Sequence, residues 1–250
     1  MPRTLLRTAC FFVSVVLAAG VGHPAEPTDN NSAITAIDIL LNPGEAMVRQ
    51  AETTNARLRA NNADCFALDA HHVPHITVLQ RYVRTDDLKQ VFAAVDSIVT
   101  AEHPSNWKLK ATGIYSVPYN GQALTWLAVE PTDELRNFQQ TLIAAIAPFT
   151  VENSAGAAFV PRADGQSIIQ PTVTFVNEYV AKYSGKNFNP HVTVGLGRED
   201  FVKQLRAEPF APFTFDIARV SIYHLGEYGT AQQKLWPKPE ANPSSSAASR

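Results

Sequence analysis

Apolar residues at helical spacing predict five helices along the chain. Leucine, valine, isoleucine and phenylalanine recur every three or four positions in two clear stripes, and Thr132 stands in the N-cap position of the second. Asn42 and Pro43 predict another helix start, with asparagine as the N-cap and proline in the first helical position. The helices are expected over 42–61, 86–98, 132–146, 171–183 and 199–206.

Alternating or continuous apolar stretches between these helices predict strands. Asn120-Gly121 separates two of the stretches and is a strong hairpin signal. Strands and helices alternate without a glycine-rich dinucleotide-binding turn, and several strands join by short turns, so the predicted fold class is α+β with antiparallel sheets. The strand regions are 33–41, 66–83, 107–115, 124–129, 187–196 and 213–225, of which the second and the last can each be a strand pair.

The two ends of the chain differ in composition from the middle. Residues 1–20 combine early arginines, a short apolar run and small residues at the exit, which is typical of a secretory signal peptide. A membrane anchor is the rival interpretation, but the run is shorter than a spanning helix needs. We expect a flexible lead-in over 21–32, a folded domain over 33–236 and a disordered Pro/Ser/Ala tail over 237–250. The protein is therefore expected to be exported, either periplasmic or secreted, with no membrane contact after signal removal.

The net charge restricts which classes of ligand the protein is suited to bind. The chain carries −2, and loss of residues 1–20 removes two arginines and no acid, which leaves −4. A mildly acidic protein is poorly suited to binding long nucleic acid through its phosphates, whereas a local site for a small phosphorylated nucleotide or an oligonucleotide end remains compatible. Cys10 lies in the predicted signal, so Cys65 is the one cysteine of the mature chain and is expected to be a buried hydrophobe. We expect a monomer.

One short sequence occurs twice. Pro-His-Ile-Thr-Val at 74–78 recurs as Pro-His-Val-Thr-Val at 190–194, each time in a strand-like context. Residues i and i+2 of a strand face the same side, so each copy should present an imidazole and a hydroxyl together, opposite a buried apolar face. Two such strands predict two similar lobes that share one cleft. The side chains that project together are His75 with Thr77, and His191 with Thr193.

Two imidazoles and two hydroxyls around one bound group suit phosphodiester chemistry. A neutral imidazole can take a proton from an attacking water, and a protonated one can give a proton to the leaving oxygen, because the ordinary histidine pKa of about 6.5 leaves both forms accessible. Hydroxyls such as those of Thr77 and Thr193 can hold the non-bridging phosphate oxygens. The scheme needs neither a metal nor a cofactor.

The motifs His75-Ile76-Thr77-Val78 and His191-Val192-Thr193-Val194 make the chain resemble the two-histidine (2H) phosphoesterase superfamily, which includes 2′,5′ RNA ligase-like proteins and cyclic nucleotide phosphodiesterases. The resemblance covers about 33–236 in the order of elements and is specific in the two motifs. It implies a bilobal fold, in which two pseudo-repeated lobes with antiparallel sheets line a central cleft and the helices lie outside. It also implies metal-independent hydrolysis, or its reversal, at a 2′,3′-cyclic phosphate or a 2′–5′ linkage.

Further residues are candidates with weaker support. Tyr115 can stack on a base, Tyr223 in the last strand can border the cleft, and Arg81 can contact phosphate, although core or surface positions are the ordinary expectation for each type. His71, His72 and His75 form an HHxxH cluster, but it contains no carboxylate, and Pro74 disfavours a helix that would align the ligands. We therefore predict no metal site.

Three functions follow in order of preference. The first is a cyclic phosphodiesterase or 2′,5′ RNA ligase-like phosphoesterase that uses His75 and His191. The second is a non-catalytic binding protein that holds a nucleotide or another phosphorylated ligand in the same cleft. The third is a metal-dependent hydrolase built on the HHxxH cluster.

Overall fold

A computed structural model describes residues 33–70 and 72–237. The predicted signal peptide over 1–20, the lead-in over 21–32 and all but the first residue of the predicted tail lie outside the described residues. The strands are β1 (Ile34–Pro43), β2 (Ile76–Arg84), β3 (Lys108–Tyr119), β4 (Gln122–Val129), β5 (Thr150–Val151), β6 (His191–Gly197), β7 (Phe213–Leu225) and β8 (Ala231–Trp236). The α-helices are α1 (Glu45–Asn61), α2 (Leu88–Glu102), α3 (Asp133–Ile146), α4 (Gln170–Tyr183) and α5 (Glu199–Ala207).

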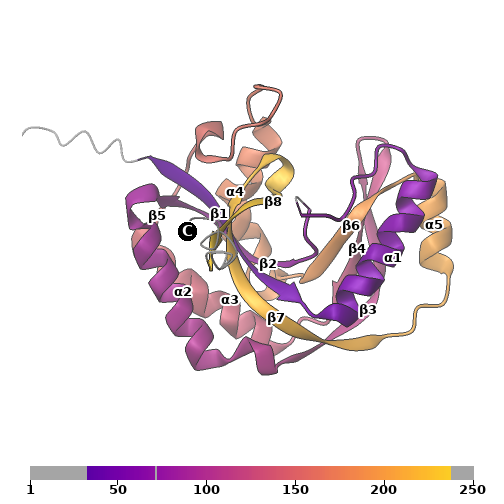
Figure 1. The fold of residues 1–250 in the computed structure, drawn as a ribbon, viewed down its shortest axis with the longest axis horizontal. Coiled ribbons are helices and arrows are strands. Elements are labelled where there is room, and N and C mark those ends of the chain that lie inside the picture. The colour runs from indigo at the N-terminus through magenta and orange to yellow at the C-terminus, as the bar shows by residue number, and fades with distance from the viewer. Residues whose placement is uncertain (1–32, 71, 238–250) are drawn as a thin grey trace, which may run out of the picture. The chain divides into compact units, whose positions relative to one another are not determined.

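The described strands form one antiparallel sheet in the order β5-β2-β1-β7-β3-β4-β6, with β8 paired to β7 (Figure 1). The long strand β7 changes neighbours along its length: its first four residues pair with β3, and the remainder pairs with β1 and β8. The α+β class with antiparallel pairing is confirmed. The division into two repeated lobes stays a prediction, because the strands follow one continuous path.

The sheet brings β2 and β6 into contact although they are not hydrogen-bonded to each other. Helix α1 packs on β6 and β7, α5 packs on β3 and β4, and α3 packs on β2 with α2 beside it (Figure 1). Alternate residues of the strands fill the core, among them Ile37, Ile39 and Leu41 of β1 and Val192 and Val194 of β6. The opposite face of the same strands carries the polar motif residues.

The predicted start of the first helix is wrong by two residues. Strand β1 continues through Pro43, and Gly44 is the N-cap of α1. The Gly44 N–H donates to the Asp216 carbonyl over 2.7 Å, and a Cβ on Gly44 would lie 3.1 Å from that oxygen. Asn42 stays in the strand, where its Oδ1 accepts a hydrogen bond from Ser221 Oγ over 2.7 Å. Pairing with β7 therefore overrides the local helix signal.

Other boundaries agree with the sequence or shift modestly. The Asn120-Gly121 hairpin is confirmed, with both φ angles positive (49° and 75°), as a type I′ turn requires. Thr132 caps α3 by accepting from the Leu135 N–H over 3.3 Å. Residues 66–70 and 72–75 are not strand, and β8 was not predicted. No helix within 33–70 and 72–237 has both the length and the apolar character needed to cross a bilayer.

Candidate functional site

The two motif histidines are held in the same way. Nδ1–H of His75 donates to the carbonyl of Val73, and Nδ1–H of His191 donates to the carbonyl of Asn189, each over 2.7 Å. A proline follows the accepting residue in both copies and restricts that residue to extended backbone, which leaves its carbonyl available to the ring. With Nδ1 engaged as the donor, the neutral imidazole carries its lone pair on Nε2. Both histidines therefore offer Nε2 for proton transfer.

A β-bulge follows the His-x-Thr sequence in each motif. Val78 is the extra residue in β2 opposite β1, and Val194 is the extra residue in β6 opposite β4. A bulge leaves a backbone carbonyl outside the ladder, and such a carbonyl needs another donor when it is buried. Gln139 Nε2 of α3 donates to the Val78 carbonyl over 2.9 Å, and Asn55 Nδ2 of α1 donates to the Val194 carbonyl over 2.8 Å. The two copies thus share a local backbone geometry and a helix-borne amide that fixes it.

Asn55 also fastens the segment that leads to the first motif. Its Nδ2 donates to the Phe66 carbonyl over 2.8 Å and lies 3.7 Å from Cys65 Sγ. Gly195 of β6 has φ of +141°, and a Cβ there would lie 2.5 Å from the same sulfur, so only glycine permits this approach. Cys65 is buried, as the sequence predicts. One packed contact therefore joins α1, β6 and the segment before His75.

The two imidazoles belong to one electrostatic site. Burial lowers the pKa of both His75 and His191 below the ordinary value, and the carbonyl bonded to each ring opposes that effect. The charge of His75 lowers the pKa of His191 further. This agrees with the contact between β2 and β6. Protonation of one histidine therefore disfavours protonation of the other.

A buried carboxyl group stands beside the first motif. Asp38 of β1 is fully buried, and its Oδ2 accepts from Thr77 Oγ1 over 3.0 Å and from Gln80 Nε2 over 3.3 Å. His75 Nε2 lies 3.7 Å from the same oxygen. Burial raises the pKa of Asp38 to about 7, against the lowering effect of the hydrogen bonds from Thr77 and Gln80. Asp38 Oδ1 has no hydrogen-bond partner among the described residues.

The second motif has a different neighbour. The Trp126 ring lies 5.2 Å from the His191 ring, centroid to centroid, at an interplanar angle of 44°. Within the described part of the chain, His191 has no ion pair and the Thr193 hydroxyl has no hydrogen-bond partner, so that hydroxyl is available to a ligand. The two motifs therefore share a backbone geometry, but among the described residues only His75 lies beside a carboxyl group.

A family model described as the 2'-5' RNA ligase superfamily matches residues 47–229 and includes both motifs. The chain belongs to this superfamily. It is the 2H phosphoesterase superfamily, so the resemblance seen in the two motifs is confirmed. Membership supports a phosphoesterase or ligase-like enzyme. A search of curated proteins gave no match to the chain.

The candidate substrate contacts lie on two different faces of the sheet. Tyr223 is the register partner of Asp38 on β7 and therefore shares the site face, where it is 9% exposed. Tyr115 is the register partner of Trp126 and is 48% exposed. Arg81 follows Gln80 and so faces the other side of the sheet, where it donates to Thr150 Oγ1 over 3.4 Å. The fold brings the two tyrosines to the site face and does not bring Arg81 there.

Of the HHxxH cluster, the structure describes His72 and His75. His72 stacks on Phe66 with ring centroids 4.9 Å apart, and its Nδ1 lies 3.7 Å from Asp69 Oδ1. His71 lies outside the described residues. Within 33–70 and 72–237, no group of three or more His, Cys, Asp or Glu side chains is arranged to hold a metal ion.

Sequence reasoning missed Asp38 and Gln80. The available signal was an acid in the middle of an apolar strand, since Asp38 is flanked by Ile37 and Ile39. An ionisable residue within a buried strand needs a partner, and that partner turned out to be the first motif.

Proposed function

We propose that this protein is a metal-independent phosphoesterase that hydrolyses a 2′,3′-cyclic phosphate or a 2′–5′ phosphodiester of a nucleotide or RNA end. The observation that carries the proposal is the matched pair of imidazoles, each with Nδ1–H bound to a carbonyl, on two strands that are in contact and with the charge of His75 lowering the pKa of His191. Membership in the superfamily supports the same reaction class.

Hydrolysis then proceeds by paired proton transfer. One neutral histidine takes a proton from water as the water oxygen bonds to phosphorus. The protonated histidine gives its proton to the ribose oxygen as the bond between that oxygen and phosphorus breaks. The Thr193 hydroxyl holds a non-bridging oxygen, where negative charge increases, and the Thr77 hydroxyl does the same once its proton turns from Asp38 Oδ2 toward the phosphate. Each acid–base group of this kind contributes roughly 10²–10⁴-fold.

The electrostatic effect of one histidine on the other separates the two roles. The charge of His75 lowers the pKa of His191, so a single proton shared by the pair resides on His75 while His191 stays neutral. We therefore assign His75 as the acid and His191 as the base in the hydrolytic direction. Because burial lowers the pKa of both histidines, the rate should be highest below about pH 6.5, the ordinary histidine value.

Replacing either histidine tests the proposal. His75→Ala and His191→Ala should each lower kcat on 2′,3′-cyclic nucleotides by at least about 100-fold, while circular dichroism and the melting temperature stay near those of the wild type. His103→Asn is a matched control, because His103 ends α2 away from the motifs with positive φ, a conformation that asparagine tolerates. The wild type should keep its activity in excess chelator.

The outcomes separate the alternatives. Full activity in either histidine variant would contradict two-histidine catalysis. Loss of wild-type activity in chelator would indicate a metal-dependent hydrolase. Nucleotide binding without turnover in the wild type would indicate a binding protein that uses the same face.

The proposal also includes where the protein acts and which ligand it binds. The pattern in residues 1–20 supports export to the periplasm or the medium. The acidic net charge supports a small nucleotide or an oligonucleotide end as the partner instead of long nucleic acid, bound by a monomer.

A further inference from the structure

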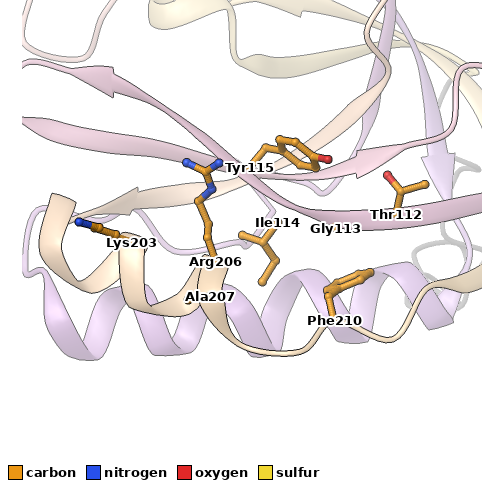
Figure 2. A pocket seen from close by; sticks show the side chains of 8 residues that line it. All are labelled: Thr112, Gly113, Ile114, Tyr115, Lys203, Arg206, Ala207 and Phe210. Atoms are coloured by element: carbon orange, nitrogen blue, oxygen red, sulfur yellow. The ribbon is translucent and has the colours of Figure 1, made fainter.

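A cavity of about 540 Å³ lies beside an unpaired edge of the sheet. β3 pairs with β7 only over Lys108–Ala111, so from Thr112 onward this edge of β3 has no neighbouring strand among the described residues. The end of α5 and Phe210, three residues beyond it, form the other wall (Figure 2). The volume lies within the range of small-molecule sites, about 300–1,000 Å³.

Two cations without acidic partners line this cavity. Arg206 lies with its guanidinium carbon 5.9 Å from the centroid of the Tyr115 ring, and it donates to Ser116 Oγ over 3.4 Å. Lys203 lies one turn earlier on α5. Neither forms an ion pair within 33–70 and 72–237, and the nearby acid Glu208 is engaged with Arg57 over 2.6 and 2.7 Å. The cavity is therefore locally positive on an acidic protein.

Tyr115 connects this cavity to the histidines. Tyr115 is the register partner of Trp126, and Trp126 is the register partner of Thr193, so all three side chains share one face of the sheet. Figure 2 shows Arg206 extending from α5 toward the Tyr115 side of β3, whereas Ile114 points back toward the helices. Two strand spacings, about 10 Å, separate Tyr115 from the second motif. Trp126 and Tyr115 therefore lie on one face of the sheet, between the second motif and the two cations.

We propose that this cavity is a nucleotide subsite separate from the histidines. The base of the unit joined to the reacting end stacks on Tyr115, and a phosphate of that unit binds Arg206 and Lys203. The inference rests on the proposed function and specifies it further: the preferred substrate is an oligonucleotide end, because a single nucleotide at the histidines leaves the subsite empty.

The test compares two substrates in the full chain: adenosine 2′,3′-cyclic phosphate and a tetraribonucleotide that ends in a 2′,3′-cyclic phosphate. We expect the wild type to have the higher kcat/KM on the tetranucleotide. In Arg206→Ala and Lys203→Ala, the ratio of tetranucleotide to mononucleotide kcat/KM should fall about tenfold and fivefold, mainly through KM, as loss of a phosphate contact requires. Added salt should raise the wild-type KM for the tetranucleotide more steeply than in Arg206→Ala.

Lys89→Ala is the matched control, since Lys89 is an exposed lysine of α2. It should leave the ratio unchanged. An unchanged ratio in Arg206→Ala, or an equal fall on both substrates, would overturn the subsite.

A binding measurement keeps this result separate from the fate of the proposed function. An unreactive tetradeoxynucleotide with a 3′-phosphate, followed by fluorescence polarisation, should bind about tenfold more weakly to Arg206→Ala than to the wild type. If the wild type turns over neither substrate, the proposed function fails, and this difference alone decides whether the subsite stands. Equal binding would refute it.

Discussion

Asp38 is a carboxyl group in a position that water does not reach, and its charge state sets its contribution to stability. Its pKa rises from 3.8 to about 7 on folding because burial penalises the anion. The folded chain therefore holds this proton more tightly than the unfolded chain, so the free energy of unfolding decreases as pH rises from about 4 to about 7. The lost stability is roughly 4 kcal/mol by the conversion of pKa to free energy.

Asp38→Asn should remove this dependence. Relative to the wild type, its free energy of unfolding should increase by a few kcal/mol between pH 4.5 and pH 7.5, as measured by urea denaturation at each pH. Asp96→Asn, at an exposed position of α2, is the control and should follow the wild type. A difference between Asp38→Asn and wild type that does not vary with pH would contradict a protonated Asp38.

At the residue scale, the alternation of side chains along a strand was enough to predict which motif residues project together. His75 and Thr77 share a side because alternate residues of a strand do, and both act on the same Asp38 oxygen. Asp38 itself was not predictable, because its partners lie 37 and 39 residues further along the chain and meet it only through the pairing of β1 with β2.

At the scale of elements, two buried amides determine how the motif strands are shaped. Gln139 and Asn55 each donate to the carbonyl of a bulged valine, and the Val78 carbonyl also accepts from Tyr179 Oη over a longer 3.5 Å. Loss of a buried amide donor costs about 1–3 kcal/mol. Gln139→Leu and Asn55→Leu should each lower the free energy of unfolding by that amount and also lower kcat, because the bulge sets the direction of the preceding histidine and threonine.

Equilibrium unfolding in urea and steady-state kinetics measure the two effects. Glu52→Leu, on the exposed side of α1, is the control for the added apolar side chain. Full stability in both amide variants would show that water replaces the amides at the bulges. Neither bulge was predictable from the sequence, since an extra residue leaves the hydrophobic alternation intact on either side. The hairpin and cap positions were predictable, because their residue types are specific to the local geometry.

At the scale of the whole described chain, the tip of the β3–β4 hairpin contacts the turn between β7 and β8. The rings of Tyr119 and Tyr228 meet edge to face, with centroids 6.5 Å apart at 84°. The same turn accepts a hydrogen bond from Gln80 Nε2 at the Gly229 carbonyl over 3.2 Å. The contact therefore joins the β3–β4 side of the sheet to the polar cluster around Asp38. Sequence patterns predict strands and their faces, but this long-range closure depends on the complete strand order.

Tyr119→Ala should loosen that turn. Backbone amides of 227–231 should exchange hydrogen faster, while global stability changes by no more than about 1 kcal/mol, as expected for one partly exposed aromatic pair. Hydrogen–deuterium exchange read by mass spectrometry measures both. Val117→Ala, on the same face of β3, should leave exchange in the turn unchanged. Unaltered exchange in Tyr119→Ala would show that the other contacts of the turn hold it, among them the hydrogen bonds from Gln80 and Thr172.

The packing of Cys65 against Asn55 and Gly195 gives the molecule an internal reporter. In a variant that begins at residue 21, Cys65 is the single cysteine. A thiol reagent can reach its sulfur only when α1, β6 and the segment before His75 move apart. The rate at which Cys65 is labelled under native conditions therefore measures how often the elements that position both histidines separate. A bound ligand that holds the two motifs together should lower this labelling rate.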